Sequence, residues 1–497
     1  MLESLKEKTG ASKLQHPLVI AVIFLATIVL GYIIAKGGVK VSMAILLLVP
    51  VLVYLNRLFN HPTLGVYTTI VMAFIAIGLT RYIRNVPFGL SIDGLLVLTI
   101  IAIFFRNFYD KIDFKQLNRD LVYLMLIWFA YSVMELFNPL ALSRTAWFYA
   151  MRGISLYPLL VIPIAFLIFM RLRHLYAFLM IWAVFSLLAT LKGLQQQYIG
   201  LDPAEQYWLD TVGRITHVIN GKLRIFSFFS DAGQFGAAQG AAGIVFLGVA
   251  PAIRGRFNKI FFYFVGIMSL WGMMISGTRG AMIVPLLGGA TFVILSKRIK
   301  IIVYGGLLMA FVYVFFAYTY IGESNYTIAR MRTAFRPEND ASYQVRLQNR
   351  AILREYLADK PFGGGIGSAG NWGQRFTPQG FLANVATDSW YVQIWAEQGR
   401  VGLILHVFIL MYIMFKGFYL IMARVKSKEL SGILGALLGG YAGIFGAAYG
   451  NGVLGQMPTG ILLYLSWAFI FASQQLDREY VDRIAQGVSP WTLKPRD

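Results

Sequence analysis

The sequence predicts an all-α polytopic membrane protein, because an apolar composition is combined with long apolar segments that recur along the chain. Hydrophobic residues make up 58% of its 497 residues and charged residues only 13%, and the mean hydropathy is +0.63. A water-soluble globular domain needs charged residues at about a quarter of its positions. The bilayer is therefore expected to be the main solvent of this chain.

Each apolar segment is interpreted as one membrane-spanning helix, because its length is near the ~20 residues that cross a hydrocarbon core. About 14 helices are predicted in this way, near residues 17–35, 39–55, 64–83, 89–105, 119–137, 154–170, 174–194, 232–250, 259–277, 280–296, 301–321, 401–420, 429–449 and 457–474. The first segment follows Lys6, Lys8 and Lys13 and precedes many further spans, which indicates an uncleaved helix and not a signal peptide.

The basic residues of the short loops set the expected orientation. Lys and Arg collect in every second loop, as the positive-inside rule requires when the N-terminus is cytoplasmic. These groups are Arg106, Lys111 and Lys115; Arg171 and Arg173; Arg254, Arg256 and Lys259; Lys297, Arg298 and Lys300; and Lys416, Arg424, Lys426 and Lys428. The long loops 195–231 and 322–388 are then periplasmic, and the tail 475–497 is cytoplasmic. Residues 1–497 are interpreted as a single integral membrane domain, capped by the loop between spans 11 and 12.

Charge and absent residue types exclude several classes of function. The net charge of +21 is explained by cytoplasmic Lys/Arg bias and by attraction to anionic lipid headgroups, so membrane lipids are expected partners and nucleic acid is not. The absence of cysteine removes disulfides, iron–sulfur clusters and cysteine nucleophiles. The sequence contains no D-x-D, H-E-x-x-H or G-x-S-x-G motif, so neither a metal nor a cofactor is predicted. An enzyme on the outer face would need a donor already activated in the membrane.

Three arginines in the loop 322–388 form the first candidate site. Arg346, Arg350 and Arg354 recur every four residues, so on a helix they follow one slowly drifting face. Guanidinium groups in a row repel one another unless an anion or water screens them. The row is either a clamp for phosphate or pyrophosphate or a solvated helix that faces lipid headgroups.

Two further arginines lie near the same outer boundary. Arg279 follows a span in the string SGTRGAM, where a charge is either functional or snorkels to the interface. Gly277 and Gly280 flank it and permit a sharp turn that directs Arg279 under the cap. The earlier loop offers Arg224 and Asp231 to the same space, although Asp231 is equally suited to cap the helix that follows.

Carboxylates and glycines complete the candidates. Asp388 stands where the cap re-enters the membrane, as a general base or as an N-cap of the next helix. Glu397 is expected to pair with a structural cation, such as Arg400 or an arginine of the cap, and not with a substrate. The string PFGGGIGSAG (361–370) lacks the G-K-[ST] ending of a P-loop. It either lets the backbone approach a glycan or lipid headgroup closely or forms a flexible turn.

The region from Met273 to Leu405 resembles the O-antigen ligase and O-antigen polymerase superfamily of bacterial membrane glycosyltransferases. The order of its short strings carries the resemblance, and the first seven spans match only in being helical. These strings are Thr278–Ala281, the S-x-x-x-R segment Ser342–Arg346, the P-[FL]-x-G-x-G segment Pro361–Gly367 and the helix Asp388–Gly399.

The resemblance implies a GT-C-like fold in the bacterial inner membrane, with the active site facing the periplasm under the cap. The donor is a glycan on undecaprenyl diphosphate, and the acceptor is a glycan or lipid A core. Arg279 and Arg346, with Arg350 and Arg224, are expected to bind the diphosphate without a metal or cofactor. Asp388 is expected to activate the acceptor, with His217 as its substitute. Arg354 and Glu397 are further possible members of the site.

One departure from the family bears on the reaction. Lipopolysaccharide ligases have a histidine where this chain has Asp388, and aspartate there resembles polymerase-like members. The resemblance therefore favours a polymerase of lipid-linked repeat units that makes O-antigen, capsule or exopolysaccharide, with a chain-length regulator as a possible partner. The alternatives are an O-antigen ligase or protein O-oligosaccharyltransferase, and a flippase for lipid-linked oligosaccharide. A flippase would carry cations deep within its spans, whereas these arginines concentrate in the outer loops.

Overall fold

A computed structural model describes residues 17–83, 86–219, 221–297, 299–335 and 341–491. The chain divides into two compact units, residues 1–64 and 65–497. The first unit contains α3 (Pro17–Asn60), in which Gly38 has non-helical angles of φ 60 and ψ −157. The predicted spans 17–35 and 39–55 are therefore two helical segments that meet at a bend, where glycine tolerates a positive φ.

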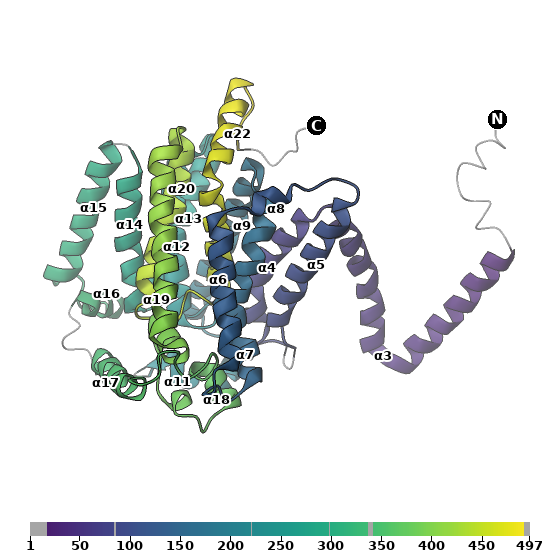
Figure 1. Ribbon diagram of the computed structural model, residues 1–497, viewed down its shortest axis with the longest axis horizontal. Coiled ribbons are helices and arrows are strands. Elements are labelled where there is room, and N and C mark those ends of the chain that lie inside the picture. The colour runs from purple at the N-terminus through teal and green to yellow at the C-terminus, as the bar shows by residue number, and fades with distance from the viewer. Residues whose placement is uncertain (1–16, 84–85, 220, 298, 336–340, 492–497) are drawn as a thin grey trace. The chain divides into compact units, whose positions relative to one another are not determined.

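The second unit is a bundle of helices (Figure 1). Its longer helices are α4 (Thr63–Leu79), which begins at the boundary between the units, α5 (Gly89–Asn107), α6 (Asp120–Met134), α7 (Arg144–Met151), α8 (Tyr157–Ile168), α9 (Leu172–Tyr198), α12 (Ala232–Val249), α13 (Arg256–Ile275), α14 (Ile283–Leu295), α15 (Ile299–Tyr318), α17 (Ala341–Tyr356), α19 (Trp390–Tyr419), α20 (Lys428–Ala447), α21 (Thr459–Phe471) and α22 (Ser473–Ala485). Shorter elements are α10 (Pro203–Trp208), α11 (Arg214–His217), α16 (Tyr326–Arg332), α18 (Gly370–Phe376) and the antiparallel strands β1 (Val218–Ile219) and β2 (Lys222–Leu223).

The helices have the lengths that a membrane requires. Within the described residues, ten helices of at least 18 residues are apolar enough to cross a bilayer. Four shorter apolar helices accompany them, at Ile45–Asn60, Thr63–Leu79, Arg279–Leu295 and Thr459–Phe471. The predicted class, an all-α polytopic membrane protein, is therefore confirmed. The predicted number of spans stays a prediction.

Small residues let the central helices α12, α14 and α20 pack closely. A Cβ atom on Gly288 would lie 2.7 Å from the carbonyl oxygen of Gly439, and one on Gly443 would lie 2.7 Å from Val284. Lipid tails are as apolar as leucine, so helices in a bilayer associate through van der Waals contact, which small residues allow. These glycines are therefore required for the backbones of α14 and α20 to approach.

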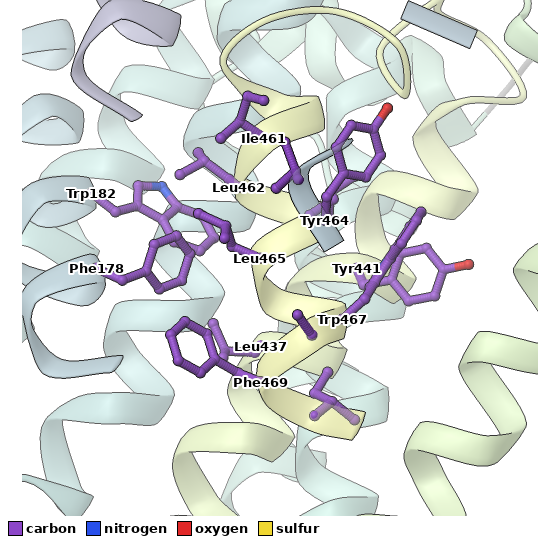
Figure 2. Close-up of a cluster of buried hydrophobic side chains, with 14 of the residues drawn as sticks. Phe178, Trp182, Leu437, Tyr441, Ile461, Leu462, Tyr464, Leu465, Trp467 and Phe469 are labelled. Atoms are coloured by element: carbon purple, nitrogen blue, oxygen red, sulfur yellow. The ribbon is translucent and has the colours of Figure 1, made fainter. Parts of the chain in front are cut away.

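Helix α21 is apolar on all sides and every one of its 13 residues is buried, as expected of a helix at the centre of a bundle. Figure 2 shows its aromatic residues among side chains of α9 and α20. Phe469 packs on Phe178 of α9 with ring centroids 5.6 Å apart, and Trp467 meets Tyr441 of α20 edge to face at 5.2 Å. The core of the second unit is thus built around α21.

One predicted helix start is wrong, and two predicted helices are joined at a glycine. The span predicted at 154–170 begins at Arg144, because α7 continues into α8 through a π-helical turn, Arg152–Leu156. Gly153 allows this turn to contact the carbonyl of Gly455. The predicted helix Asp388–Gly399 and the predicted span 401–420 are the two parts of α19, which begins at Trp390 and bends at Gly399 with φ 66. Polar residues hid only the first part of the span that begins at Arg144.

The two long loops contain structure of their own. Residues 322–388 form α16, α17 and α18 with two 3₁₀ turns, η7 (Thr333–Phe335) and η9 (Leu382–Asn384). Within the second unit, Figure 1 shows α11, α17 and α18 at one end of the bundle, with α22 at the other. The segments that carry the predicted site residues are therefore gathered at a single end.

Candidate functional site

A cavity of about 1880 Å³ lies at the end of the bundle that carries α17 and α18. Its walls come from α7, α14, α16, α17, α18 and the segment between α20 and α21. The predicted site residues that line it are Arg224, Arg279, Arg346 and Asp388. The predicted site residues that are not among the described lining residues are His217, Arg350, Arg354 and Glu397.

One side of the cavity, here called the arginine wall, consists of Arg224, Arg279, Arg330 and Arg346. These residues come from four separate segments: the end of the β1–β2 pair, the 3₁₀ turn η6 (Arg279–Met282), α16 and α17. Gly277 has φ +61 and makes the turn that precedes Arg279. The sharp turn predicted at this glycine is therefore present.

Hydrogen bonds to neutral oxygens hold three of these guanidinium groups. Arg224 donates to the hydroxyl of Thr278 at 2.9 Å, and that hydroxyl donates to the Ala232 carbonyl at 2.9 Å. Arg279 donates to the hydroxyl of Thr333 at 3.1 Å. Arg330 donates to the Gly277 carbonyl at 2.7 Å. These contacts orient the three guanidinium groups.

The described residues that line the cavity carry more positive than negative charges. Its described lining carries six arginines and two aspartates, Asp231 and Asp388. Burial lowers the pKa of Arg224, and the nearby positive charges of Arg330, Arg279 and Arg346 act in the same direction, whereas Asp231 opposes them. An arginine remains protonated in a protein. The arginine wall is therefore a site of concentrated positive charge that an anion would stabilise.

Asp231 has the two roles that the sequence left open. Its carboxylate accepts a hydrogen bond from the amide of Gln234 at 2.9 Å and caps α12, while the hydroxyl of Ser230 donates to its other oxygen at 2.8 Å. The capping interpretation is confirmed, and the same side chain also lines the cavity. The cap fixes the start of α12 beside the arginine wall.

Asp388 faces the arginine wall directly. Its Oδ2 atom lies 3.4 Å from Nε of Arg346. The N-cap interpretation is wrong, because the N-cap of α19 is Ser389, and the hydroxyl of Ser389 donates to the Ala448 carbonyl at 3.2 Å. About half of the Asp388 side chain, 49%, is exposed, so the carboxylate is open to a ligand in the cavity.

The three spaced arginines have different surroundings although they share α17, which is helical as predicted. Arg346 lines the cavity, whereas Arg350 donates to the hydroxyl of Tyr449 at 2.6 Å and lies over its ring at 4.5 Å. Tyr449 itself lines the cavity, so Arg350 contacts a residue of the lining without lining the cavity itself. Arg354 is exposed.

His217 is held within the first outer loop. It is 3% exposed and packs edge to face against Trp208 and Phe226. Its Nδ1 lies 3.0 Å from the Gly213 carbonyl and its Nε2 lies 3.3 Å from the Ser230 carbonyl. Burial lowers the pKa of this imidazole. These surroundings are those of a packing residue.

Glu397 does not pair with Arg400, so that expectation is wrong. The Glu397 side chain is 0% exposed and accepts a hydrogen bond from the amide of Ala369 at 3.2 Å. Arg400 instead donates to the Ala358 carbonyl at 2.5 Å. The backbone carbonyl of Glu397 accepts from Gly365 at 2.8 Å. Glu397 therefore fastens the glycine-rich segment 361–370 to α19.

Three contributors were missed by sequence reasoning. Arg330 lies in the same loop as the arginines that were chosen, and its only signal was its type. Arg81 follows an apolar span, is 4% exposed, and donates to the carbonyls of Ser227 and Phe229, which fixes the segment that carries Arg224. Asn451 lies so close to two glycines that a Cβ on Gly280 would be 2.6 Å from its Nδ2 atom. Arg81 could have been found from the sequence, because it is a charged residue at the end of an apolar span.

The fold and the cavity together define a polytopic membrane protein with an arginine-rich cavity at one end of its helix bundle. Residues 264–407 match the family model of O-antigen ligase. The predicted resemblance to the O-antigen ligase and O-antigen polymerase superfamily is therefore confirmed. The matched range includes Arg279, Arg330, Arg346 and Asp388, while Arg224 precedes it. A search of curated proteins found no match.

Proposed function

We propose that this protein is a membrane glycosyltransferase that polymerises repeat units carried on undecaprenyl diphosphate into a surface polysaccharide. The convergence of four arginines from four segments on one cavity is the observation that supports it. Guanidinium groups match phosphate oxygens with planar pairs of hydrogen bonds and stay charged. A diphosphate has enough oxygens to engage several of them at once.

The cavity also has an apolar side suited to a lipid tail. Ile283 and Leu286 of α14 line it together with Tyr313 of α15 and Phe335 of η7. Ile283 and Tyr313 are 39% and 46% exposed, on helices of the kind that contact lipid. Ile283 follows Arg279 by one helical turn. A diphosphate on the arginine wall would therefore leave its polyprenyl chain beside this apolar side.

Asp388 would activate the acceptor hydroxyl. The acceptor hydroxyl oxygen attacks the anomeric carbon while the bond from that carbon to the diphosphate oxygen breaks, with inversion. Asp388 orients the hydroxyl and accepts its proton, and the arginine wall stabilises the charge that develops on the leaving diphosphate. Because Asp388 is 3.4 Å from Arg346, the base and the leaving-group site are adjacent.

In the proposed orientation, this cavity lies at the periplasmic face of a bacterial inner membrane, under the cap 322–388 of a GT-C-like fold. The clusters of arginine at the opposite end support that orientation. They surround a second cavity of about 700 Å³ beside α22, whose lining includes Arg119, Arg171, Arg173, Arg478 and Arg483. Cytoplasmic loops carry an excess of such residues.

A reconstituted assay tests the proposal. Purified protein in nanodiscs receives the lipid-linked repeat unit of its own host, and a gel resolves the products. We expect a ladder and released lipid diphosphate from the wild type, and a loss of at least about 100-fold in rate from Arg279→Ala or Arg346→Ala, as expected when a charge-stabilising donor is removed. Arg354→Ala is the matched control, because it removes an exposed arginine of the same helix. Equal losses in all three variants, or wild-type rates in all, would contradict the proposal.

A ligase is the second candidate, because the matched family model is that of O-antigen ligase. The donor and the arginine wall would be the same, and the acceptor would be lipid A core or a protein serine or threonine. Wild-type protein that binds the lipid-linked donor, makes no ladder alone, and transfers one glycan when lipid A core is added would favour the ligase. Donor movement across the bilayer without transfer to any of these acceptors would favour a flippase.

A further inference from the structure

A second surface of the large cavity is aromatic. Tyr149 of α7 and Trp372 of α18 line the cavity with ring centroids 5.0 Å apart and planes 21° from parallel. Phe376, one turn after Trp372, stacks on Tyr149 at 5.5 Å with an angle of 15°. The three rings thus lie nearly parallel. We call Tyr149 and Trp372, which line the cavity, the aromatic wall, and Phe376 supports it by packing on Tyr149.

The glycine-rich segment 361–370 fixes the aromatic wall. Gly367 has φ +84, and a Cβ there would lie 2.5 Å from the carbonyl of Ala146 in α7. A Cβ on Gly373 in α18 would lie 2.2 Å from the carbonyl of Ser368. The segment therefore joins α7 to α18 through backbone contacts that a side chain would prevent. The close approach that the sequence predicted is made to protein, and its effect is to hold Tyr149 against Trp372.

Polar side chains surround these rings. Asn371, Gln374 and Arg375 line the same cavity, and the Arg375 guanidinium lies 5.2 Å from the ring centre of Phe376. Arg152 also lines the cavity and is paired with Asp93 at 2.8 Å. Aromatic faces beside amide and guanidinium donors suit a ligand with apolar C–H faces and many hydroxyl groups. A pyranose ring has that character.

We propose that the aromatic wall is a glycan subsite, which rests on the proposed glycosyltransferase function and names where a sugar ring of the substrate binds. The first sugar of the donor is bonded to its diphosphate and so belongs beside the arginine wall. The sugar ring that binds to Tyr149 and Trp372 is therefore not the first sugar of the donor. It belongs either to the acceptor glycan or to the outer sugars of the donor repeat unit, which share the same chemistry.

Binding measurements separate the two walls. The ligands are the free repeat-unit oligosaccharide of the host polysaccharide and undecaprenyl diphosphate without sugar. We expect Trp372→Ala to weaken oligosaccharide binding about tenfold, the loss expected for one aromatic contact, while the Kd for undecaprenyl diphosphate changes less than about twofold. Arg279→Ala should give the reverse pattern. Trp372→Phe should restore most of the lost binding, because it returns an aromatic face.

Phe381→Ala is the matched control. Phe381 is 44% exposed and stacks on Tyr356 at 4.2 Å at the same end of the bundle, and it is not among the described residues that line the cavity. It should leave oligosaccharide binding unchanged. Unchanged binding in Trp372→Ala, or an equal loss of both ligands, would overturn the glycan subsite.

Rates of glycan transfer show whether the bound sugar ring belongs to the acceptor or to the donor. They also test the glycan subsite separately from the proposed function. If Trp372→Ala raises the KM for the acceptor and leaves the KM for the donor unchanged, the bound sugar ring belongs to the acceptor. The opposite pattern assigns the sugar ring to the donor. Wild-type turnover together with an unaffected Trp372→Ala variant would overturn the subsite and keep the glycosyltransferase. A wild-type protein that binds undecaprenyl diphosphate and the oligosaccharide but transfers nothing would refute the proposed function and keep the glycan subsite.

Discussion

Arg346 is the residue at which the two parts of the proposed chemistry meet. It belongs to the arginine wall, and its Nε atom lies 3.4 Å from Asp388. A backbone glycine, Gly450, lies beside it on the other side, where an added Cβ would be 3.6 Å from Nη1 of Arg346. In the proposed reaction, the Arg346 guanidinium would therefore contact the leaving diphosphate and hold the carboxylate of Asp388.

Asp388→Asn tests the role of that carboxylate. The amide keeps the shape of the side chain but cannot accept a proton, so we expect the rate of transfer to fall by about 10²- to 10⁴-fold. Undecaprenyl diphosphate binding should be kept or strengthened, because the negative charge beside Arg346 is removed. Rates from the nanodisc assay and the Kd of the lipid diphosphate provide the measurement. Asp359→Asn, an exposed carboxylate of the same cap, should be neutral, and a near-wild-type rate in Asp388→Asn would exclude the base role.

Single residues also show where sequence reasoning reaches its limit. Arg279 and Arg346 were predictable as site candidates, because charges at the end of spans and in an outer loop can reach a common space. Arg350 and Arg346 could not be separated, since a step of four residues turns a helix by only about 40° beyond a full circle. Tyr449, about 100 residues further along the chain, decides the difference by binding Arg350. Such a contact is not encoded in the local pattern.

At the scale of elements, the apolar pattern predicted most helices but missed the first part of the span Arg144–Ile168. For α19, the apolar run predicted only residues 401–420, because Gln393, Glu397 and Gln398 interrupt it, and the part Asp388–Gly399 was predicted from the family resemblance. Glu397 is tolerated because it is buried in protein and binds the Ala369 amide, whereas Gln393 lines the cavity. The hydrophobic pattern of a membrane protein reflects contact with lipid. A helix that packs polar side chains against a structured loop is therefore not detected by that pattern.

Gly399→Ala tests how far the bend of α19 depends on glycine. Gly399 has φ +66, and a Cβ there would lie 2.0 Å from the carbonyl of Pro361. We expect a loss of about 3 kcal/mol or more, from backbone strain and the clash together, measured as thermal unfolding in detergent. Gly487→Ala is the control, since Gly487 has φ +69 with nothing within 4 Å of an added Cβ. It should cost about 1 kcal/mol from strain alone. Equal losses would show that the contact with Pro361 does not matter.

At the scale of the whole second unit, the cavity combines three surfaces that come from distant parts of the chain. The arginine wall, the apolar side formed by α14, α15 and η7, and the aromatic wall surround one space. Each surface suits one part of a lipid-linked glycan: the diphosphate, the tail and a sugar ring. The sequence could predict the first surface from charge. The aromatic wall was hidden, because tyrosine and tryptophan are common in any membrane protein.

The orientation of that unit in the membrane decides which substrates can reach the cavity. The chain contains no cysteine, so a single introduced cysteine reports its own side without background. Gln379 is exposed between α18 and η9, and Lys428 is exposed at the start of α20. In spheroplasts, a membrane-impermeant maleimide should label Gln379→Cys at once and Lys428→Cys only after the membrane is permeabilised, as the distribution of basic loops requires. The reverse pattern would place the arginine wall in the cytoplasm, where sugar nucleotides are available, and would remove the reason for a lipid-linked donor on the outer face.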